Sequence, residues 1–288
     1  MYAVAGVSGN TGSGVARTLL ERGLPVRVIV RKESKGAPWA AKGAEVAVAD
    51  FFDAESMTRA MAGASGVYLL NPPFSHGDPF ERAEAVAAAL ARAVEASGVP
   101  KMVVLSSIGA QHDTGTGMIR TNRLMERALA GKAPATAFLR CAYFLENWAP
   151  MVGVVSAMGN LPAFLHPIDR AIPMVAAADI GRVAAATLLE EWSGTRIVEL
   201  EGPARYSPSD IGAAFSKATG SPVTVLAVPD TQWASLMGMG GIPSAVIPHF
   251  IGMFEGINNG TVDFEGAGAS HIYGRITSAE AIAALVNA

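Results

Sequence analysis

Three evenly spaced glycines, placed directly after the first apolar run, constrain the fold of this 288-residue chain more than any other feature. The run Tyr2–Ala5 leads into Gly6, Gly9 and Gly12, and a helical pattern follows over Val15–Arg22. A strand, a glycine-rich turn and a helix in this order begin a βαβ unit. Such a unit belongs to a parallel sheet that is covered by helices.

The same alternation continues through the first half of the chain. Strands are expected at Tyr2–Ala5, Pro25–Val30, Glu45–Val48, Gly66–Leu70, Lys101–Ser106 and Ala135–Leu139. Helices are expected between them at Val15–Arg22, Ser56–Ala62, Phe80–Ala96 and Asn122–Ala130. Strands that alternate with helices of about ten residues are typical of a parallel sheet. The sequence therefore predicts an α/β fold with a Rossmann-type doubly wound sheet.

The pattern loosens after about residue 150, where glycine and proline become frequent. We expect a helix at Asp179–Glu191 and strands at Arg196–Leu200 and Val223–Leu226. Open α/β sheets bind their ligands at the carboxyl edge. The sequence thus predicts a dinucleotide-binding domain over 1–150 and a smaller, mixed substrate-binding region over 151–288 at that edge.

Composition excludes several classes of protein. The chain is 50% hydrophobic and only 16% charged, which argues against intrinsic disorder. Its 22 basic and 25 acidic residues give a net charge of −3, which provides no electrostatic reason to bind nucleic acid or an anionic membrane. The single cysteine, Cys141, excludes an intrachain disulfide.

Two apolar segments resemble targeting or membrane signals, but neither has the features that such a signal requires. Tyr2–Ala5 is too short for the core of a signal peptide, and no basic residue precedes it. Thr231–Phe254 carries no charge, but its glycines and prolines would break a lipid-facing helix. We interpret this second segment as buried or as covering a pocket. No membrane association is expected, and the predicted location is cytoplasmic.

The glycine loop has the features that a dinucleotide diphosphate requires. Gly6 can form the tight turn, Gly9 can leave room for the phosphates, and Gly12 can bring the helix close to the strand. Asn10 and Thr11 fall where backbone amides and side chains would touch phosphate oxygens. The alternative is a glycine-rich turn that binds no ligand.

The residues after the second and third strands favour one dinucleotide. An NAD site places an acidic residue at the end of the second strand, whereas this chain has Arg31 and Lys32 there. A guanidinium can bind the additional phosphate of NADP(H), so NADP(H) is preferred and NAD(H) is possible. Asp50 could accept a hydrogen bond from the adenine amino group. Asn71 and Pro72 would line the middle of the cofactor, although prolines there could simply stiffen a loop.

Taken together, these motifs resemble the NmrA-like family of atypical short-chain dehydrogenase/reductases. The matching stretches are Gly6–Gly12, Arg31, Asp50, Asn71–Pro73, Val103–Ala110, Phe138–Asn147 and Ala178–Gly181. The resemblance is good over about residues 1–200. It implies NADPH-dependent reductases of quinones, azo dyes and triphenylmethane dyes, or redox-sensing regulators that bind the nucleotide with little or no catalysis.

The chain departs from ordinary short-chain dehydrogenases in its catalytic pair. Those enzymes use Tyr-x-x-x-Lys, in which the lysine lowers the pKa of the tyrosine, and no tyrosine of this chain is followed by lysine at that spacing. The resemblance further implies that Asn122, four residues before Glu126, replaces a lysine of some catalytic relatives. Lysine-assisted carbonyl reduction is therefore poorly supported. Electron-poor acceptors demand less, because a well-positioned nicotinamide can suffice for them.

Polar residues that follow the fifth and sixth strands are the candidates for the active site. Ser106 and Ser107 end the fifth strand and could bind the nicotinamide carboxamide or the substrate, or merely cap the strand end. Tyr143 could donate a proton, or could pack with its hydroxyl satisfied. With Asn122, Ser107 and Tyr143 form the predicted catalytic set.

Other chemically active residues carry weaker hypotheses. Cys141 is expected to be a buried, unreactive thiol, and His112 a solvated loop histidine. Met237, Met239 and Met253 suit either core packing or an apolar wall for a planar substrate. No metal site is expected, because the histidines lack ligand spacing; they are His76, His112, His166, His249 and His271.

Two functional hypotheses follow. The first is an NADPH-dependent oxidoreductase that transfers hydride to a quinone-like or other conjugated small-molecule acceptor. The alternative is an NADP(H)-sensing regulatory protein with little or no catalysis. The expected partner is a small-molecule substrate. Under either hypothesis the chain could also pair with a second copy of itself or with a regulatory protein.

Overall fold

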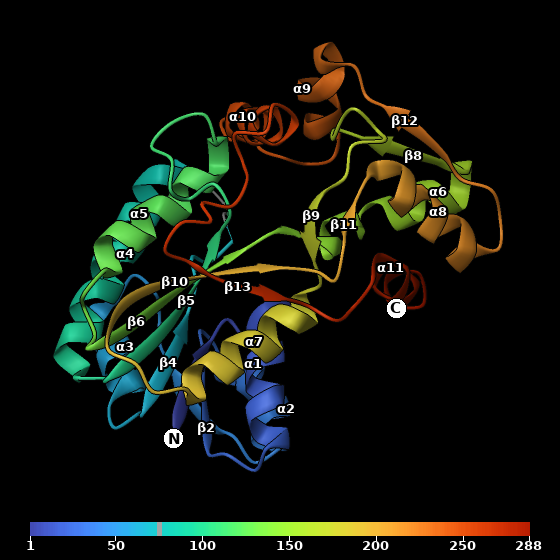
Figure 1. Ribbon diagram of the computed structural model, residues 1–288. Helices are drawn as coiled ribbons and strands as arrows, with labels where there is room; N and C mark the ends of the chain where they lie inside the picture. Colours follow the sequence, from blue (N-terminus) through green and yellow to red (C-terminus); the bar gives the residue numbers. More distant parts are fainter. Residues whose placement is uncertain (74–76) are drawn as a thin grey trace.

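The computed structural model describes residues 1–73 and 77–288, and in these residues an eight-stranded parallel sheet forms the centre of the molecule (Figure 1). The strands lie in the order β13-β10-β6-β5-β4-β1-β2-β3, and every neighbouring pair is parallel. The strands are β1 (Tyr2–Ala5), β2 (Val26–Val30), β3 (Glu45–Val48), β4 (Gly66–Leu69), β5 (Lys101–Ser107), β6 (Ala135–Cys141), β10 (Gly194–Glu201) and β13 (Ser270–Tyr273). The predicted doubly wound α/β fold is confirmed.

Helices cover both faces of this sheet, because successive residues of each strand point to opposite sides. Val4 packs in one core cluster with Leu19, whereas its neighbour Ala3 belongs to a second cluster with Leu90. The first layer contains α1 (Asn10–Glu21), α2 (Glu33–Ala40) and α7 (Ala177–Leu189), and the second contains α3 (Ala54–Met61), α4 (Pro79–Ser97) and α5 (Arg120–Leu129). Figure 1 shows the two layers on either side of the strands.

The remaining elements gather beyond the carboxyl edge of the sheet (Figure 1). A small mixed sheet has the order β11-β9-β7, and β12 pairs with β8. These strands are β7 (Tyr143–Phe144), β8 (Asn160–Ala163), β9 (Ile172–Val175), β11 (Arg205–Tyr206) and β12 (Thr224–Ala227). The helices are η1 (Gly117–Ile119), η2 (Leu145–Trp148), α6 (Met151–Met158), α8 (Pro208–Thr219), α9 (Asp230–Met239), α10 (Ile247–Asn258) and α11 (Ser278–Val286).

The chain after residue 150 serves both parts of the molecule. It supplies β10 and β13 to the large sheet and α7 to one of its faces, besides the elements at the carboxyl edge. Gly181 of α7 packs directly on Gly14 of α1, where an added Cβ would lie 2.6 Å from the Gly14 Cα. The division at residue 150 into two domains stays a prediction.

Two helices show the clearest differences from the sequence-based expectation. Helix α1 begins at Asn10 rather than Val15, so that Gly12 lies inside its first turn. Helix α2 was not expected, because Gly36 and Pro38 are poor helix formers. A Cβ on Gly36 would collide with the side chain of Val46, so close packing on β3 explains the glycine.

The uncharged segment Thr231–Phe254 forms α9 and the first part of α10. Trp233 and Met237 are buried in a small core cluster, and Met253 lines the cavity described below. Most of the segment is exposed, including Leu236 and Met239, so the expectation that it is buried is wrong for most of its length, and only its carboxyl end, at Met253, covers the cavity. Within residues 1–73 and 77–288, none of the helices combines the length and apolarity needed to cross a membrane.

Candidate active site

The glycine loop joins β1 to α1 with the backbone geometry that its spacing predicts. Gly6 has a positive φ of 71°, which favours glycine, and its carbonyl oxygen accepts from the Gly9 amide at 2.9 Å. A Cβ on Gly12 would lie 2.5 Å from the carbonyl oxygens of Ala5 and Gly6, so only glycine lets α1 sit this close to β1. Gly12 is therefore fixed by a close backbone approach.

The amino-terminal turn of α1 is open to a negatively charged ligand. Gly9 occupies the N-cap position, so no side chain caps the helix, and the first turn contains no acidic residue. Asn10 is exposed and Thr11 is buried beneath it. Uncapped amides at a helix start carry a partial positive charge that favours phosphate. The loop thus fits a dinucleotide diphosphate.

Basic residues lie at the end of the neighbouring strand β2. Arg31 and Lys32 are exposed immediately after Val30. In the described part of the chain, the Arg31 guanidinium makes no ion pair or hydrogen bond and is available to a ligand. Asp50, exposed after β3, already accepts from the Phe52 amide at 3.0 Å. All three predicted residues lie at the carboxyl edge, as the parallel register of β2 and β3 requires.

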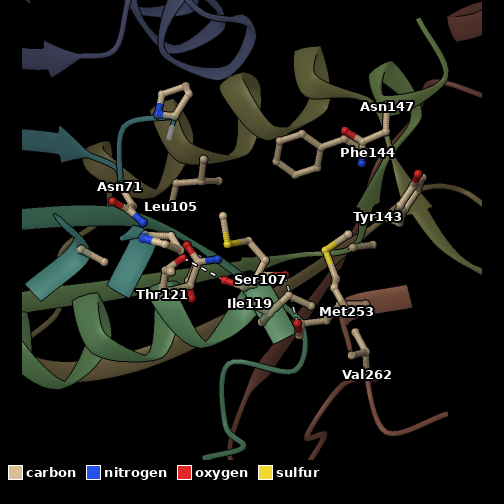
Figure 2. Close-up of a pocket in the computed structure, with 18 of the residues that line it drawn as sticks. Asn71, Leu105, Ser107, Ile119, Thr121, Tyr143, Phe144, Asn147, Met253 and Val262 are labelled. Carbon is tan, nitrogen blue, oxygen red and sulfur yellow. Dashed lines mark hydrogen bonds between the residues drawn. The ribbon is translucent and has the colours of Figure 1, made fainter. Parts of the chain in front are cut away.

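A cavity of about 310 Å³ lies at the same edge, beyond β4, β5 and β6 (Figure 2). It adjoins the glycine loop, because Leu70 packs against Gly6 and the next residue, Asn71, lines the cavity. The lining residues are Asn71, Pro72, Pro73, Pro79, Arg82, Ala83, Val86, Leu105, Ser106, Ser107, Ile108, Met118, Ile119, Thr121, Asn122, Ala142, Tyr143, Phe144, Asn147, Ile172, Pro173, Met253, Ile257 and Val262. Most of these side chains are apolar.

Elements far apart in the sequence enclose the cavity. One face of α4 supplies Pro79, Ala83 and Val86, which follow helical spacing. On another side, α10 supplies Met253 and Ile257. Helix α10 approaches closely because Gly256 packs on the loop before η1; a Cβ there would lie 2.5 Å from the Gly115 carbonyl oxygen. The carboxyl-edge region therefore covers the cavity.

All three predicted catalytic residues line this cavity. Ser107 ends β5, Asn122 lies in the first turn of α5, and Tyr143 begins β7. Figure 2 shows Ser107 and Tyr143 on its walls. The predicted cofactor residues Asn71, Pro72 and Ser106 line it as well. The glycine loop, Arg31, Lys32 and Asp50 are not among the lining residues and lie along the edge toward β3.

The environment of Tyr143 keeps its hydroxyl protonated. Burial raises the pKa of the Tyr143 phenol well above its usual range, and the polar side chain of Asn147 opposes this only in part. A neutral phenol is a donor as well as an acceptor. Ser107 is different, since its hydroxyl donates to the carbonyl oxygen of Ile108 at 3.0 Å.

A buried ionic network beneath the cavity was not found by sequence reasoning. The Ser106 hydroxyl donates to Glu126 Oε1 at 2.6 Å, and Arg140 donates to both carboxylate oxygens of Glu126 at 2.9 and 2.7 Å. A further nitrogen of Arg140 donates to Glu265 at 2.5 Å. Burial lowers the pKa of Arg140, but these carboxylates outweigh it and hold the pKa above its ordinary value. The one sequence signal is Arg140, a charged residue within the otherwise apolar pattern of Ala135–Cys141.

Of the weaker candidates on the described residues, all but Met253 lie outside the cavity lining. Cys141 is buried, as expected, and burial raises the pKa of its thiol well above the usual value, which disfavours the reactive thiolate. His112 lies in the loop after β5. Met239 is exposed, so of the three methionines only Met253 contributes to the cavity wall. His76 lies outside the described residues, and the described ones contain no cluster suited to a metal ion.

The conserved pattern of the NmrA-like family matches residues 2–274. This chain belongs to the NmrA-like family. The match confirms the resemblance and extends it into the region after residue 200, where the motifs were weak. It covers the glycine loop, the cavity and β13.

Three known proteins show how far the similarity extends. An NAD(P)H azoreductase from Xenophilus azovorans is 26% identical over 247 residues, which cover 85% of this chain and 83% of the azoreductase. The structure of an NADPH-dependent quinone oxidoreductase from Escherichia coli, complexed with NADPH, matches with a TM-score of 0.83 and 23% identity over 99% of each chain. Triphenylmethane reductase from Citrobacter sp., complexed with NADP(H), has a TM-score of 0.81 and 19% identity, covering 99% of this chain and 100% of the reductase. The two solved structures share the fold.

Proposed function

We propose that the chain is an NADPH-dependent oxidoreductase that reduces a quinone-like or other flat conjugated acceptor. The observation that carries this proposal is a mostly apolar cavity at the carboxyl edge of the sheet, next to a loop shaped for a diphosphate. The azoreductase, quinone oxidoreductase and triphenylmethane reductase to which the chain is similar all have names that denote reduction of conjugated molecules.

The residues along the edge favour NADPH as the reductant. The uncapped amino terminus of α1 suits the diphosphate, and the exposed Arg31 suits the additional phosphate. The nicotinamide would then reach the ends of β4 and β5, where Asn71 and Ser106 line the cavity. NAD(H) would bind the same loop without the contact to Arg31.

The chain's own residues have distinct tasks in such a reaction. A bound dihydronicotinamide supplies the hydride, and a proton must reach the reduced acceptor separately. Tyr143 is the proposed donor, because its phenol lines the cavity and remains protonated. Ser107 and Asn122 would orient the acceptor through hydrogen bonds, while Met253 and Phe144 exclude water around it.

The direct test measures NADPH oxidation by the purified protein with quinones, azo dyes, triphenylmethane dyes and enones. We expect oxidation above the enzyme-free rate with at least one flat acceptor, and a slower reaction with NADH. The absence of oxidation with every acceptor, in a preparation that binds NADPH, would remove the catalytic proposal.

One observation favours the alternative, an NADP(H)-sensing protein. Asn122 lines the cavity in place of a lysine, and none of the described lining residues is a lysine. A sensor should bind NADP⁺ and NADPH with different affinities and should change its assembly or partner binding. Calorimetric titration combined with sedimentation measures both properties. Equal affinities and an unchanged sedimentation coefficient would count against sensing.

A further inference from the structure

Ser106 is the cavity residue whose hydroxyl is most tightly held by the protein. It is only 4% exposed, and its oxygen lies 2.6 Å from Glu126 Oε1. Glu126 is itself buried on α5, and among the described residues the partly exposed Ser107 has only the carbonyl oxygen of Ile108 as partner of its hydroxyl. The contact between Ser106 and Glu126 thus combines short length with burial.

The direction of this hydrogen bond follows from charge. Arg140 donates to both oxygens of Glu126, so the carboxyl group is ionised and can only accept. Ser106 must therefore donate its one hydrogen to Glu126. Ser106 lines the cavity, and a hydroxyl oxygen that has given its hydrogen to Glu126 keeps only lone pairs, so toward any further group it can act only as a hydrogen-bond acceptor.

We propose that Glu126, held by Arg140, is a positioning residue that fixes the Ser106 hydroxyl as an acceptor toward the cavity. Ser106 then selects a ligand group that donates, and the primary carboxamide of a nicotinamide is such a group. A nicotinamide whose amide hydrogens point to Ser106 has its ring orientation fixed, which is what hydride transfer requires. This inference rests on the proposed function, because it assumes that the cavity holds the nicotinamide.

The proposal predicts discrimination between two dinucleotides that differ by one donor. The 3-acetylpyridine analogue of NADP⁺ keeps the carbonyl group but replaces the amide nitrogen with a methyl group. The wild-type protein should bind NADP⁺ about fivefold more tightly than this analogue, the effect of one hydrogen bond. Both dissociation constants are measured by calorimetry in the absence of acceptor, so the result does not depend on activity.

Variants then assign the discrimination to the network. Ser106→Ala removes the acceptor, and Glu126→Gln removes the charge that directs the Ser106 hydrogen. In both variants the affinity ratio should fall to about one. Glu265→Gln is the matched control, since it removes the charge of the carboxylate that Arg140 contacts at 2.5 Å but leaves Glu126 on Ser106. Its ratio should stay near that of the wild type.

Stability is followed by thermal unfolding, because Glu126→Gln leaves Arg140 less well neutralised inside the protein. If that variant does not fold, Glu126→Asp replaces it: the charge is kept but the shorter side chain withdraws from Ser106, and the ratio should again fall. A wild-type ratio of one, or a ratio that persists in Ser106→Ala or in a folded Glu126 variant, overturns the proposal. Failure of the wild type to bind NADP⁺ at all would instead overturn the proposed function.

Discussion

The two ends of the ligand-binding edge are built differently. At the glycine loop, the ligand-facing groups are backbone amides from one short segment that joins β1 to α1. At the cavity, they are side chains from α4, β5, α5, β7 and α10. The geometry of the glycine loop depends on how closely α1 approaches β1. The geometry of the cavity depends on how elements from distant parts of the sequence pack together.

This difference predicts different responses to substitution. A change in the backbone approach should displace every amide of the loop together, so cofactor binding should be lost as a whole. A change in one cavity side chain should remove a single contact and leave the rest in place. The substitutions that follow are chosen to break or sharpen this contrast.

The largest effect is expected from Gly12→Ala. The new Cβ would lie 2.5 Å from two backbone carbonyl oxygens, which cannot rotate away, so α1 must shift from β1. Overpacking of this kind costs about 1–3 kcal/mol of stability. Since several phosphate contacts move together, the NADP⁺ dissociation constant should rise at least about 100-fold, as measured by calorimetry.

The control for this prediction is Gly153→Ala in α6. No atom lies within 4 Å of a Cβ at that position, so the substitution should be neutral or stabilising by up to about 1 kcal/mol. If Gly12→Ala bound NADP⁺ as well as Gly153→Ala does, close packing of the loop would not govern cofactor binding.

A smaller and more selective loss is expected from Arg31→Ala. The side chain is exposed beside the loop, so its removal should not disturb α1. NADP(H) binding should weaken by about 1–3 kcal/mol, the range of a charged hydrogen bond, while NAD(H) affinity is unchanged. Arg92→Ala, on the exposed side of α4, controls for the general loss of positive charge. Equal losses for both dinucleotides would mean that Arg31 has no role in phosphate recognition.

The same contrast explains what the sequence could predict. The glycine loop could be predicted in detail, because Gly6, Gly9 and Gly12 act over seven consecutive residues between a strand and a helix. The alternation of parallel strands and helices in the first half could be predicted for the same local reason, because each strand and helix has its own short sequence pattern. Helix α2 could not be predicted, because Gly36 has a low helix propensity. The glycine is explained by its close packing against Val46 on β3, and this tertiary contact is not visible in helix propensities.

The cavity was predictable only in part. Ser107 and Tyr143 are predicted because polar residues after parallel strands meet at one edge, whereas Asn122 is predicted only from the resemblance to the family; the structure brings all three to the cavity. The buried pair of Glu126 and Arg140 was missed, because partners fourteen positions apart on a helix and a strand leave no periodic signal. The position of α10 over the cavity depends on Gly256, whose role is visible only from its contact with Gly115.

A moderate effect on rate, without an effect on cofactor binding, is expected from Tyr143→Phe. Loss of the proton donor should lower kcat about tenfold or more. The expected loss is smaller than the usual contribution of a general acid, because an electron-poor acceptor depends less on proton donation. Since burial raises the pKa of the Tyr143 phenol, it stays protonated, and wild-type kcat should show no alkaline loss below about pH 10. The checks are steady-state rates across this pH range and a calorimetric NADP⁺ titration. An alkaline limb near about pH 8 that disappears in the variant would contradict this assignment.

The smallest effect is expected from Tyr68→Phe, beneath the glycine loop. Tyr68 is fully buried on β4 next to Thr11, and its hydroxyl meets hydrogen-bond geometry with none of the described residues. An unsatisfied buried hydroxyl costs free energy, so its removal should leave the free energy of unfolding unchanged or raise it by about 1 kcal/mol. NADP⁺ affinity should stay the same, because the loop is held by the approach of α1 to β1 rather than by side chains below it. The contradicting result would be a fall of several degrees in melting temperature together with weaker NADP⁺ binding. It would show that the Tyr68 phenol supports the glycine loop through a buried water. Side chains would then contribute at the glycine loop as they do at the cavity, and the two ends of the edge would differ less than their geometry indicates.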